Sequence, residues 1–228
     1  MASTKFKCPY CGKEFTRERT LQVHMCEPKR RYLQKDEKWV VNAFMVFQRF
    51  YQIHQKNTKP KTYDEFVKSA YYNAFVKFGR YIMHINPLYP ERYIDYVLHS
   101  KIKLDHWARD DLYEAYLIDA IKREPVEAAL QRTITTMMDW ATEQNVQWSD
   151  YFRLVNTNRA VQHIQQGKIS PWLLLGCNAG KRMLKSLNDE QLEMISKYIS
   201  LKFWSQKIKS SPADQLFVQE TAKEAKIE

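Results

Sequence analysis

Three of the four cysteines of this 228-residue chain lie near its N-terminus, at Cys8, Cys11 and Cys26, with His24 before the third. Two residues separate Cys8 from Cys11, and thiolates at that spacing on a tight turn can bind one tetrahedral Zn²⁺. A unit this short cannot build an apolar core large enough to fold without metal. Cysteines grouped with a histidine in this way do not form the framework of a secreted disulfide protein. We therefore expect a zinc-stabilised unit in a reducing compartment.

The residues between the second cysteine and the histidine supply the small core that such a unit needs. Phe15 follows the second cysteine by four residues, and Leu21 precedes His24 by three. Residues 16–26 are predicted to form a helix, with Thr16 as its N-cap. Leu21 and His24 then share the inner face, because residues three apart are neighbours on a helix.

Residues 5–31 resemble the Cys2His2-type zinc finger, in which cysteines, a phenylalanine, a leucine and a histidine recur at the spacing C-x2-C-x3-F-x5-L-x2-H found here. The resemblance implies a ββα-like fold, a bound Zn²⁺ and reading of DNA or RNA by the exposed helix face. A single finger contacts only about three base pairs and binds duplex weakly. The residues near its contact positions are Arg17, Arg19, Thr20 and Val23.

The sequence departs from this family at the fourth ligand. The family places His or Cys three to five residues after the first histidine, where this chain has Pro-Lys-Arg at 28–30. Cys26 remains as the candidate, but residues i and i+2 point to nearly opposite sides of an intact helix. We therefore predict that the helix unwinds around Met25 and Cys26, helped by Pro28, which disfavours helix in the residue before it. The alternative is a three-ligand knuckle with Cys26 merely nearby. The predicted metal ligands are Cys8, Cys11, His24 and Cys26.

The charge of the chain indicates the kind of partner. The formal net charge is +10 at pH 7, a balance that favours an anionic partner, most often nucleic acid. Residues 1–38 hold ten Lys and Arg against five Asp and Glu. The run Lys-Arg-Arg at 29–31 places phosphate-directed charge just past the finger helix. A finger that binds a protein, or only stabilises the terminus, is the alternative. The predicted nucleic-acid contacts are Lys13, Arg17, Arg19, Lys29, Arg30 and Arg31.

The composition predicts helices for the rest of the chain. Only five glycines are present, 14% of the residues are aromatic, and β-branched alternation is scarce. We expect a mostly α fold: a zinc finger over 1–31, an all-α helical domain over 32–208 and a polar C-terminal tail over 209–228.

Local patterns place some of these helices. Apolar residues recur at intervals of three and four over 34–56, which predicts one amphipathic helix. Thr62 and Glu65 form a capping box for the next helix. Pro90 is expected in the first turn of a helix over 91–99.

Two groups in the helical body allow a functional interpretation beside a structural one. Lys77 and Arg80 interleave with aromatic residues and could belong to a base-stacking platform, but a core helix with a solvated basic edge is favoured. Asp105, His106 and Asp110 could serve a metal-dependent nuclease. Because no recognisable nuclease spacing is present, we favour a helix capped by Asp105, with acids at its positive end.

A weaker resemblance concerns the whole plan. The finger, the following CEPKRRYLQKDE and the aromatic helical body are similar to uncharacterised finger-headed proteins of large tailed phages. Size, charge and helicity are similar to those of phage helicase-loading and recombination-mediator proteins. These resemblances imply an accessory protein of DNA replication, recombination or transcription.

We therefore expect a binding protein rather than an enzyme. Its partners would be nucleic acid, DNA more than RNA, and a protein of a replication or transcription complex. The alternatives are a protein-interaction adaptor, a virion component or a metal-dependent nuclease.

No apolar run is long enough to span a bilayer, and the N-terminus lacks the apolar segment of a signal peptide. We expect a soluble intracellular protein with no membrane partner, in the host cytoplasm if it is viral.

Overall fold

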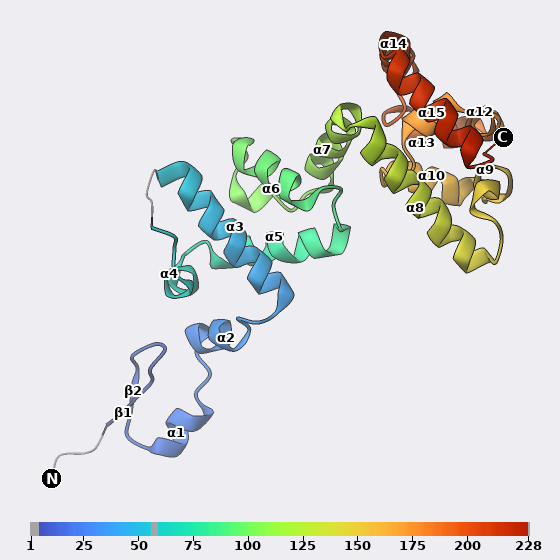
Figure 1. The fold of residues 1–228 in the computed structure, drawn as a ribbon. Helices are drawn as coiled ribbons and strands as arrows, with labels where there is room; N and C mark the ends of the chain where they lie inside the picture. The colour runs from blue at the N-terminus through green and yellow to red at the C-terminus, as the bar shows by residue number, and fades with distance from the viewer. Residues whose placement is uncertain (1–4, 56–58, 228) are drawn as a thin grey trace. The chain divides into compact units, whose positions relative to one another are not determined.

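The computed structural model describes residues 5–55 and 59–227, and nearly all of its elements are helices (Figure 1). One small two-stranded sheet lies near the N-terminus. This confirms the predicted fold class, a ββα-like finger followed by a helical body. Backbone contacts divide the chain into two compact units, Met1–Tyr113 and Glu114–Glu228.

The first unit begins with a hairpin and two short helices. Strand β1 (Phe6–Lys7) pairs antiparallel with β2 (Glu14–Phe15), so that Phe6 lies opposite Phe15. Helix α1 (Glu18–Val23) follows, and α2 (Glu27–Leu33) begins after a break of three residues. This break allows the chain to bring Cys26 back toward the hairpin.

Helices α3 (Lys38–Gln55) and α5 (Tyr72–Ile85) pack closely in the helical part of the first unit. A β-carbon added at Gly79 would lie 2.3 Å from the carbonyl oxygen of Trp39, so only glycine allows this approach. The helix predicted over 34–56 begins at Lys38, after the separate helix α2. The remaining elements here are α4 (Tyr63–Lys68), α6 (Pro90–His99) and the 3-10 helix η1 (Leu104–His106).

Large aromatic side chains fill the core between these helices. Phe47, Phe66, Phe75, Phe78 and Trp107 are all buried. The Phe47 and Phe75 rings meet edge to face with centroids 5.3 Å apart, and Phe78 meets Trp107 in the same way at 5.4 Å. This is the geometry that aromatic quadrupoles favour. The burial of the α5 aromatic residues fits the core-helix interpretation of this segment.

Two helix starts follow their sequence signals. The backbone N–H of Glu65 donates to the Thr62 hydroxyl at 3.3 Å, and the N–H of Thr62 donates to the Glu65 carboxylate at 2.8 Å. This confirms the predicted capping box at α4. Pro90 occupies the first turn of α6, as its fixed φ angle predicts.

The second unit surrounds two buried tryptophans. The rings of Trp172 and Trp204 meet edge to face with centroids 5.6 Å apart. Arg132 forms an ion pair with the buried Glu124 and donates to the Gly167 carbonyl at 2.7 Å. The elements are α8 (Val126–Gln144), η2 (Trp148–Asp150), α9 (Tyr151–Leu154), α10 (Thr157–Gln165), α11 (Pro171–Gly176), α12 (Asn178–Lys185), α13 (Asp189–Ser196), α14 (Leu201–Ser210) and α15 (Pro212–Glu224).

The C-terminal segment differs from the polar tail expected over 209–228. Most of it forms α15, in which Val218 and Ala222 are buried. A β-carbon added at Gly176 would lie 2.5 Å from the Val218 side chain, so α15 packs on α11. The expected helical domain over 32–208 also differs from the observed units, because their boundary falls inside α7 (Asp110–Arg123).

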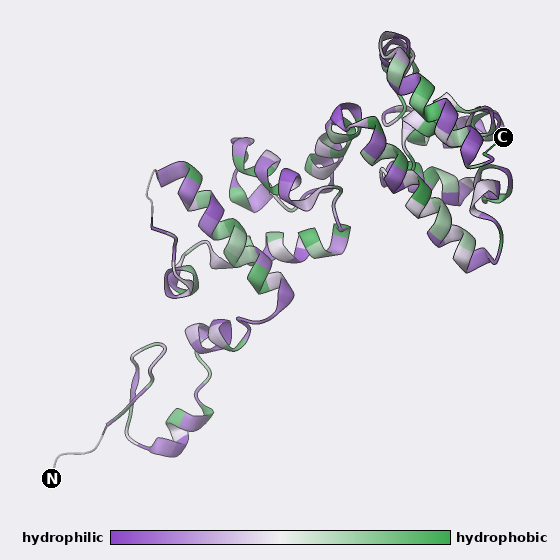
Figure 2. Ribbon diagram, viewed as in Figure 1, coloured by the Kyte–Doolittle hydropathy of each residue, from purple (hydrophilic) through white to green (hydrophobic). Residues whose placement is uncertain are grey.

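Hydrophobic and hydrophilic residues share the same helices, as the mixed colours of α3 and α8 show (Figure 2). Helices α3 and α8 therefore each bury an apolar face and expose a polar one. In the part of the chain that the structure describes, no helix is both long enough and apolar enough to cross a membrane.

Candidate metal centre

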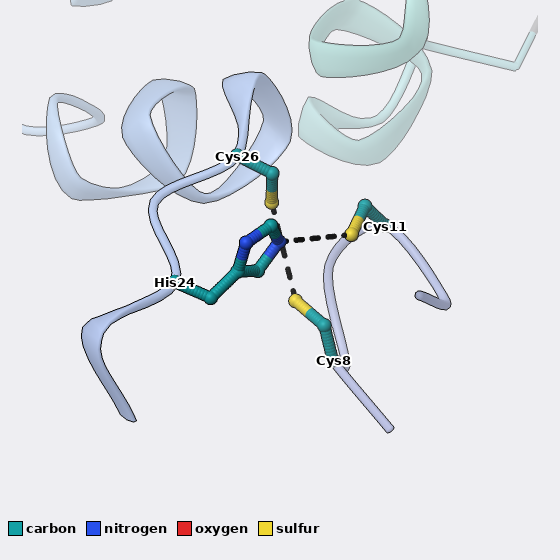
Figure 3. Close-up of side chains that lie close together, drawn as sticks. All are labelled: Cys8, Cys11, His24 and Cys26. Atoms are coloured by element: carbon teal, nitrogen blue, oxygen red, sulfur yellow. Dashed lines mark hydrogen bonds between the residues drawn. The ribbon is translucent and has the colours of Figure 1, made fainter. Parts of the chain in front are cut away.

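The first two ligands lie on the turn of the β1–β2 hairpin. The N–H of Cys8 donates to the Lys13 carbonyl at 2.9 Å, and the N–H of Gly12 donates to the Cys8 carbonyl at 2.9 Å. Gly12 has a φ of 74°, a left-handed conformation that glycine adopts without strain. This tight turn points the thiols of Cys8 and Cys11 to the same side (Figure 3).

The other two ligands lie in the break between α1 and α2. Helix α1 ends at Val23, and His24 has extended backbone angles of φ −67° and ψ 121°. Cys26 is the extended N-cap of α2, and Pro28 lies in the first turn of that helix. The predicted unwinding at residues 25 and 26 is therefore confirmed. Pro28 contributes by starting a new helix, a position that its missing N–H tolerates.

The predicted bounds of the finger helix were wrong at both ends. The prediction ran from 16 to 26 with Thr16 as the N-cap, whereas α1 covers Glu18–Val23 and has Arg17 as an N-cap without a side-chain hydrogen bond. Metal-ligand geometry determines the end of this helix, because two ligands two residues apart cannot both face one ion from a continuous helix.

The four side chains meet at one point (Figure 3). Their ligand atoms all lie within 4.8 Å of one another. The Sγ atoms of Cys8 and Cys26 are 3.9 Å apart, and Cys11 Sγ is 3.3 Å from His24 Nε2. Tetrahedral zinc, with bonds of about 2.3 Å to sulfur and 2.0 Å to nitrogen, requires about 3.8 Å between two sulfurs and about 3.5 Å between sulfur and nitrogen. The residues fit a closed Cys3His zinc site, and Cys26 faces the other three ligands.

The surroundings of the ligands differ in burial. Cys8 is buried, while Cys11 is exposed. Burial acts to raise the pKa of the Cys8 thiol, but hydrogen bonds from the backbone N–H groups of Cys11 and Tyr10 and from neighbouring thiols bring the pKa below its ordinary value. Thiolate formation, which zinc binding requires, is thus favoured at the most buried ligand.

Phe15 closes the inner side of the site. Its ring centroid lies 4.8 Å from that of the His24 imidazole, and Leu21 is partly buried on α1. Both residues therefore lie where the spacing predicted them. Four protein ligands leave no open position for a substrate, which is typical of structural zinc. The ion, when bound, joins the hairpin to the two helices.

The six predicted nucleic-acid contacts fall into two groups. Lys13, Arg17 and Arg19 are exposed, and within the described residues neither Arg17 nor Arg19 has an acidic partner. Lys29 donates to the His24 carbonyl at 3.1 Å, and Arg30 forms an ion pair with Glu27 while 59% of its side chain stays exposed.

Arg31 is placed differently from the other predicted phosphate contacts. Only 15% of its side chain is exposed. Its Nη1 donates to the Val67 carbonyl at 2.5 Å, and its guanidinium lies 4.3 Å from the centre of the Tyr72 ring. The sequence has three adjacent cations at 29–31. The third, Arg31, points inward because its guanidinium contacts the Val67 carbonyl on α4 and the Tyr72 ring on α5. Arg31 attaches α2 to the helical body.

A column of tyrosines also connects the finger to the helical body. Tyr10, between the first two cysteines, has its ring centroid 5.3 Å from that of Tyr32 on α2. Tyr32 lies 5.6 Å from Tyr63 of α4, and the Tyr63 hydroxyl donates to the Arg31 carbonyl at 2.8 Å. Sequence analysis missed this column, because its members are far apart in the chain and no periodic pattern relates them.

The residues considered for a nuclease site make other contacts. Asp110 accepts a hydrogen bond from the Tyr81 hydroxyl at 2.9 Å, and the His106 ring is 3.5 Å from the Arg109 guanidinium. Among the described residues, the Cys3His group is the cluster of three or more possible metal ligands that the fold brings together.

Comparison with known proteins agrees with this geometry at the N-terminus. Residues 6–27 match the family model for the zinc finger of C2H2 type. No curated protein and no solved structure matches the chain. The N-terminal segment is thus a zinc finger that binds Zn²⁺, with cysteine in place of the second histidine. A finger of this family is consistent with binding to nucleic acid or to protein. These comparisons do not show the resemblance to phage proteins.

Proposed function

We propose that the first unit binds nucleic acid through its zinc finger. The distribution of charge is the observation that supports this most. Residues 1–113 contain 21 Lys and Arg against 12 Asp and Glu, a formal net charge of +9. Residues 114–228 contain 15 against 14, a net charge of +1. The excess positive charge therefore belongs almost entirely to the unit that contains the finger, as expected for an electrostatic footprint on phosphate.

We propose that helix α1 contacts the bases of the nucleic acid. Its exposed face begins at Arg17 and Arg19, which have no acidic partner among the described residues. Arginines of this kind bind phosphates or the acceptor edge of guanine. Lys13 on the hairpin and Lys29 and Arg30 of α2 flank this face. We propose DNA as the partner in preference to RNA, because a finger helix enters the wide major groove of B-form duplex.

Binding and its salt dependence test the proposal. The zinc-loaded full chain is titrated into labelled duplex DNA, single-stranded DNA and duplex RNA, with fluorescence anisotropy as the readout. The affinity for duplex DNA is expected to fall with salt between about 50 and 200 mM, with a slope of about 0.9 per phosphate contacted. A double variant, Arg17→Ala with Arg19→Ala, is expected to lower that slope by about two.

A matched control separates a specific contact from loss of net charge. Lys202 and Lys209 are exposed on α14 of the second unit, and replacing both by alanine removes the same two charges. This control is expected to bind DNA like the unaltered chain. Equal weakening by the two double variants, or binding that does not respond to salt, would refute the proposal.

A protein partner is the second candidate, and two exposed apolar side chains support it. Val23 at the end of α1 is 74% exposed, and Met25 in the break is 57% exposed. Apolar groups exposed together beside a rigid zinc site can anchor a polypeptide. If a double variant of these two residues to serine abolished capture of a partner in nuclease-treated extract while DNA binding was unchanged, the adaptor function would be favoured. A role in phage-type replication, recombination or transcription stays a prediction from the sequence.

A further inference from the structure

A lone finger is a small DNA-binding element. It covers about three base pairs and gives few contacts. Useful affinity therefore requires more contacts from elsewhere in the molecule. The helical part of the first unit is the nearest source, because 32–113 contain thirteen Lys and Arg against nine Asp and Glu.

The finger and this helical part form one continuous structure. Cys26 is a zinc ligand and also the N-cap of α2. Five residues later, Arg31 donates to the Val67 carbonyl and lies over the Tyr72 ring at 4.3 Å. Tyr32 packs between Tyr10 of the hairpin and α4. A charge on α5 is therefore held at a fixed distance from the finger when zinc is bound.

Arg80 is a charge on α5 that contacts the start of α3. Its guanidinium carbon is 4.0 Å from the centre of the Trp39 ring, and Trp39 is the second residue of α3, just after α2 ends. Arg80 is exposed, and no acidic partner for it exists among the described residues. An arginine over an indole keeps its N–H groups at the edge, where they can bind a phosphate in a bidentate manner.

The spacing along α5 relates this charge to the finger. Arg80 follows Tyr72, the residue that Arg31 of α2 contacts, by eight positions. At 1.5 Å per residue the two positions are about 12 Å apart along the helix axis. Arg80 therefore lies about two helical turns beyond the residue of α5 that α2 contacts.

We propose that Arg80, held over Trp39, is a second phosphate-binding residue of this protein, which extends the DNA contact from the finger onto α5. The inference rests on the proposed function. Lys77, one turn earlier on α5, and Lys38, next to Trp39, are exposed and add positive charge nearby. Asp36 and Glu37 supply the opposing charge in the α2–α3 junction, and neither forms an ion pair with Arg80 in the described structure. The partner is a phosphate backbone, so the contact is independent of base sequence.

The chain offers a matched control for the test. Arg92 of α6 also lies over an aromatic ring, with its guanidinium carbon 4.8 Å from the centre of Tyr89. It is exposed in the same unit. Arg80→Ala and Arg92→Ala therefore remove the same charge and the same type of contact from different helices. The zinc-loaded variants are titrated into labelled duplex DNA at several salt concentrations, with zinc content and circular dichroism recorded to verify folding.

Arg80→Ala is expected to bind about tenfold more weakly at low salt, the effect of losing one charge-assisted contact, and its salt slope is expected to fall by about one. Arg92→Ala is expected to bind like the unaltered chain. Arg80→Lys is expected to recover the slope and part of the affinity, because the positive charge is kept without the planar guanidinium.

Equal affinities for Arg80→Ala and Arg92→Ala would overturn the inference while leaving the finger proposal intact. Unchanged binding by the Arg17→Ala, Arg19→Ala variant would overturn the proposed function itself.

Discussion

The Sγ atoms of Cys8 and Cys26 lie 3.9 Å apart, although eighteen positions separate the two residues in the chain. That distance is the edge of a zinc–thiolate tetrahedron with bonds of about 2.3 Å. It is reached because α1 stops at Val23 and the chain is extended at His24. The finger thus completes its site with a cysteine two residues after the histidine, closer than its family places the fourth ligand.

Replacing Cys26 should therefore disrupt the metal site. Cys26→Ala is expected to weaken zinc binding by more than the 10- to 100-fold that loss of an outer-shell partner typically costs. The finger, whose apolar core is too small to fold it without zinc, should lose its structure with the metal. Competition with a chelator measures the affinity, and the absorption of the cobalt-substituted protein reports how many thiolates bind.

The fourth cysteine gives the control for this variant. Cys177 is buried in the second unit, where its Sγ accepts a hydrogen bond from the N–H of Gly180 at 3.4 Å. Cys177→Ser removes a thiol but keeps an acceptor, so one zinc per chain should remain bound. A three-ligand site would be indicated instead if Cys26→Ala held zinc as tightly as Cys177→Ser.

The two adjacent arginines of α2 should respond differently to truncation. Arg31→Ala removes the donor to Val67 and the contact with Tyr72, and it is expected to lower the free energy of unfolding of the first unit by about 2 kcal/mol. Arg30→Ala should change stability little, since its ion pair with Glu27 is largely exposed. Urea unfolding distinguishes these outcomes.

DNA binding by the same pair gives the second half of this prediction. At a temperature where both variants are folded, Arg30→Ala is expected to reduce the salt slope by about one. Arg31→Ala should keep the slope of the unaltered chain, because its guanidinium is not on the surface. Equal slopes for the two variants, both reduced, would restore the role that the sequence suggested for Arg31.

The finger was predictable from sequence because its chemistry is local. The Cys8–Cys11 spacing, and the clash between an intact helix and a ligand at Cys26, required the break that the structure has. The capping box at Thr62 is local in the same sense. The contacts of Arg31 could not be predicted, because Val67 and Tyr72 lie more than thirty residues away and no spacing rule relates them to Arg31.

The division into two units was not visible in the sequence for a different reason. Linkers between domains are recognised by polar, Pro-rich or Gly-rich composition, but this boundary lies within the continuous helix α7. The packing of the last helix, α15, was also not predicted from the sequence. Val218 and Ala222 show a helical spacing of four, yet the charged residues around them gave this stretch the composition of a tail.

The contact between α3 and α5 predicts a severe effect for a small substitution. In Gly79→Ala the new β-carbon would lie 2.3 Å from the Trp39 carbonyl oxygen and 3.0 Å from the Ala43 nitrogen. Both are backbone atoms, so the helices must move apart. We expect a loss of about 3 kcal/mol in the free energy of unfolding, at the upper end for overpacking.

Asn73→Ala, at an exposed position of the same helix, is the control, and it should instead raise the free energy of unfolding by a few tenths of a kcal/mol. Thermal unfolding of the two variants compares them, and a stable Gly79→Ala protein would contradict the close packing.

The second unit should lose stability in acid through His163. This side chain is buried, with Nδ1 2.8 Å from the Tyr151 hydroxyl. Burial, with smaller contributions from Lys168 and Arg159, lowers its pKa to about 4.

Between the ordinary histidine pKa of about 6.5 and this lowered value, the unfolded chain binds a proton at His163 that the folded chain does not bind. The stabilisation is therefore complete above pH 6.5 and is lost as the pH falls toward 4, by about 3 kcal/mol. His163→Gln should flatten this pH dependence in urea unfolding, whereas His106→Gln, at an exposed histidine of η1, should keep it. The assignment fails if His163→Gln retains the full acid dependence of the unaltered chain.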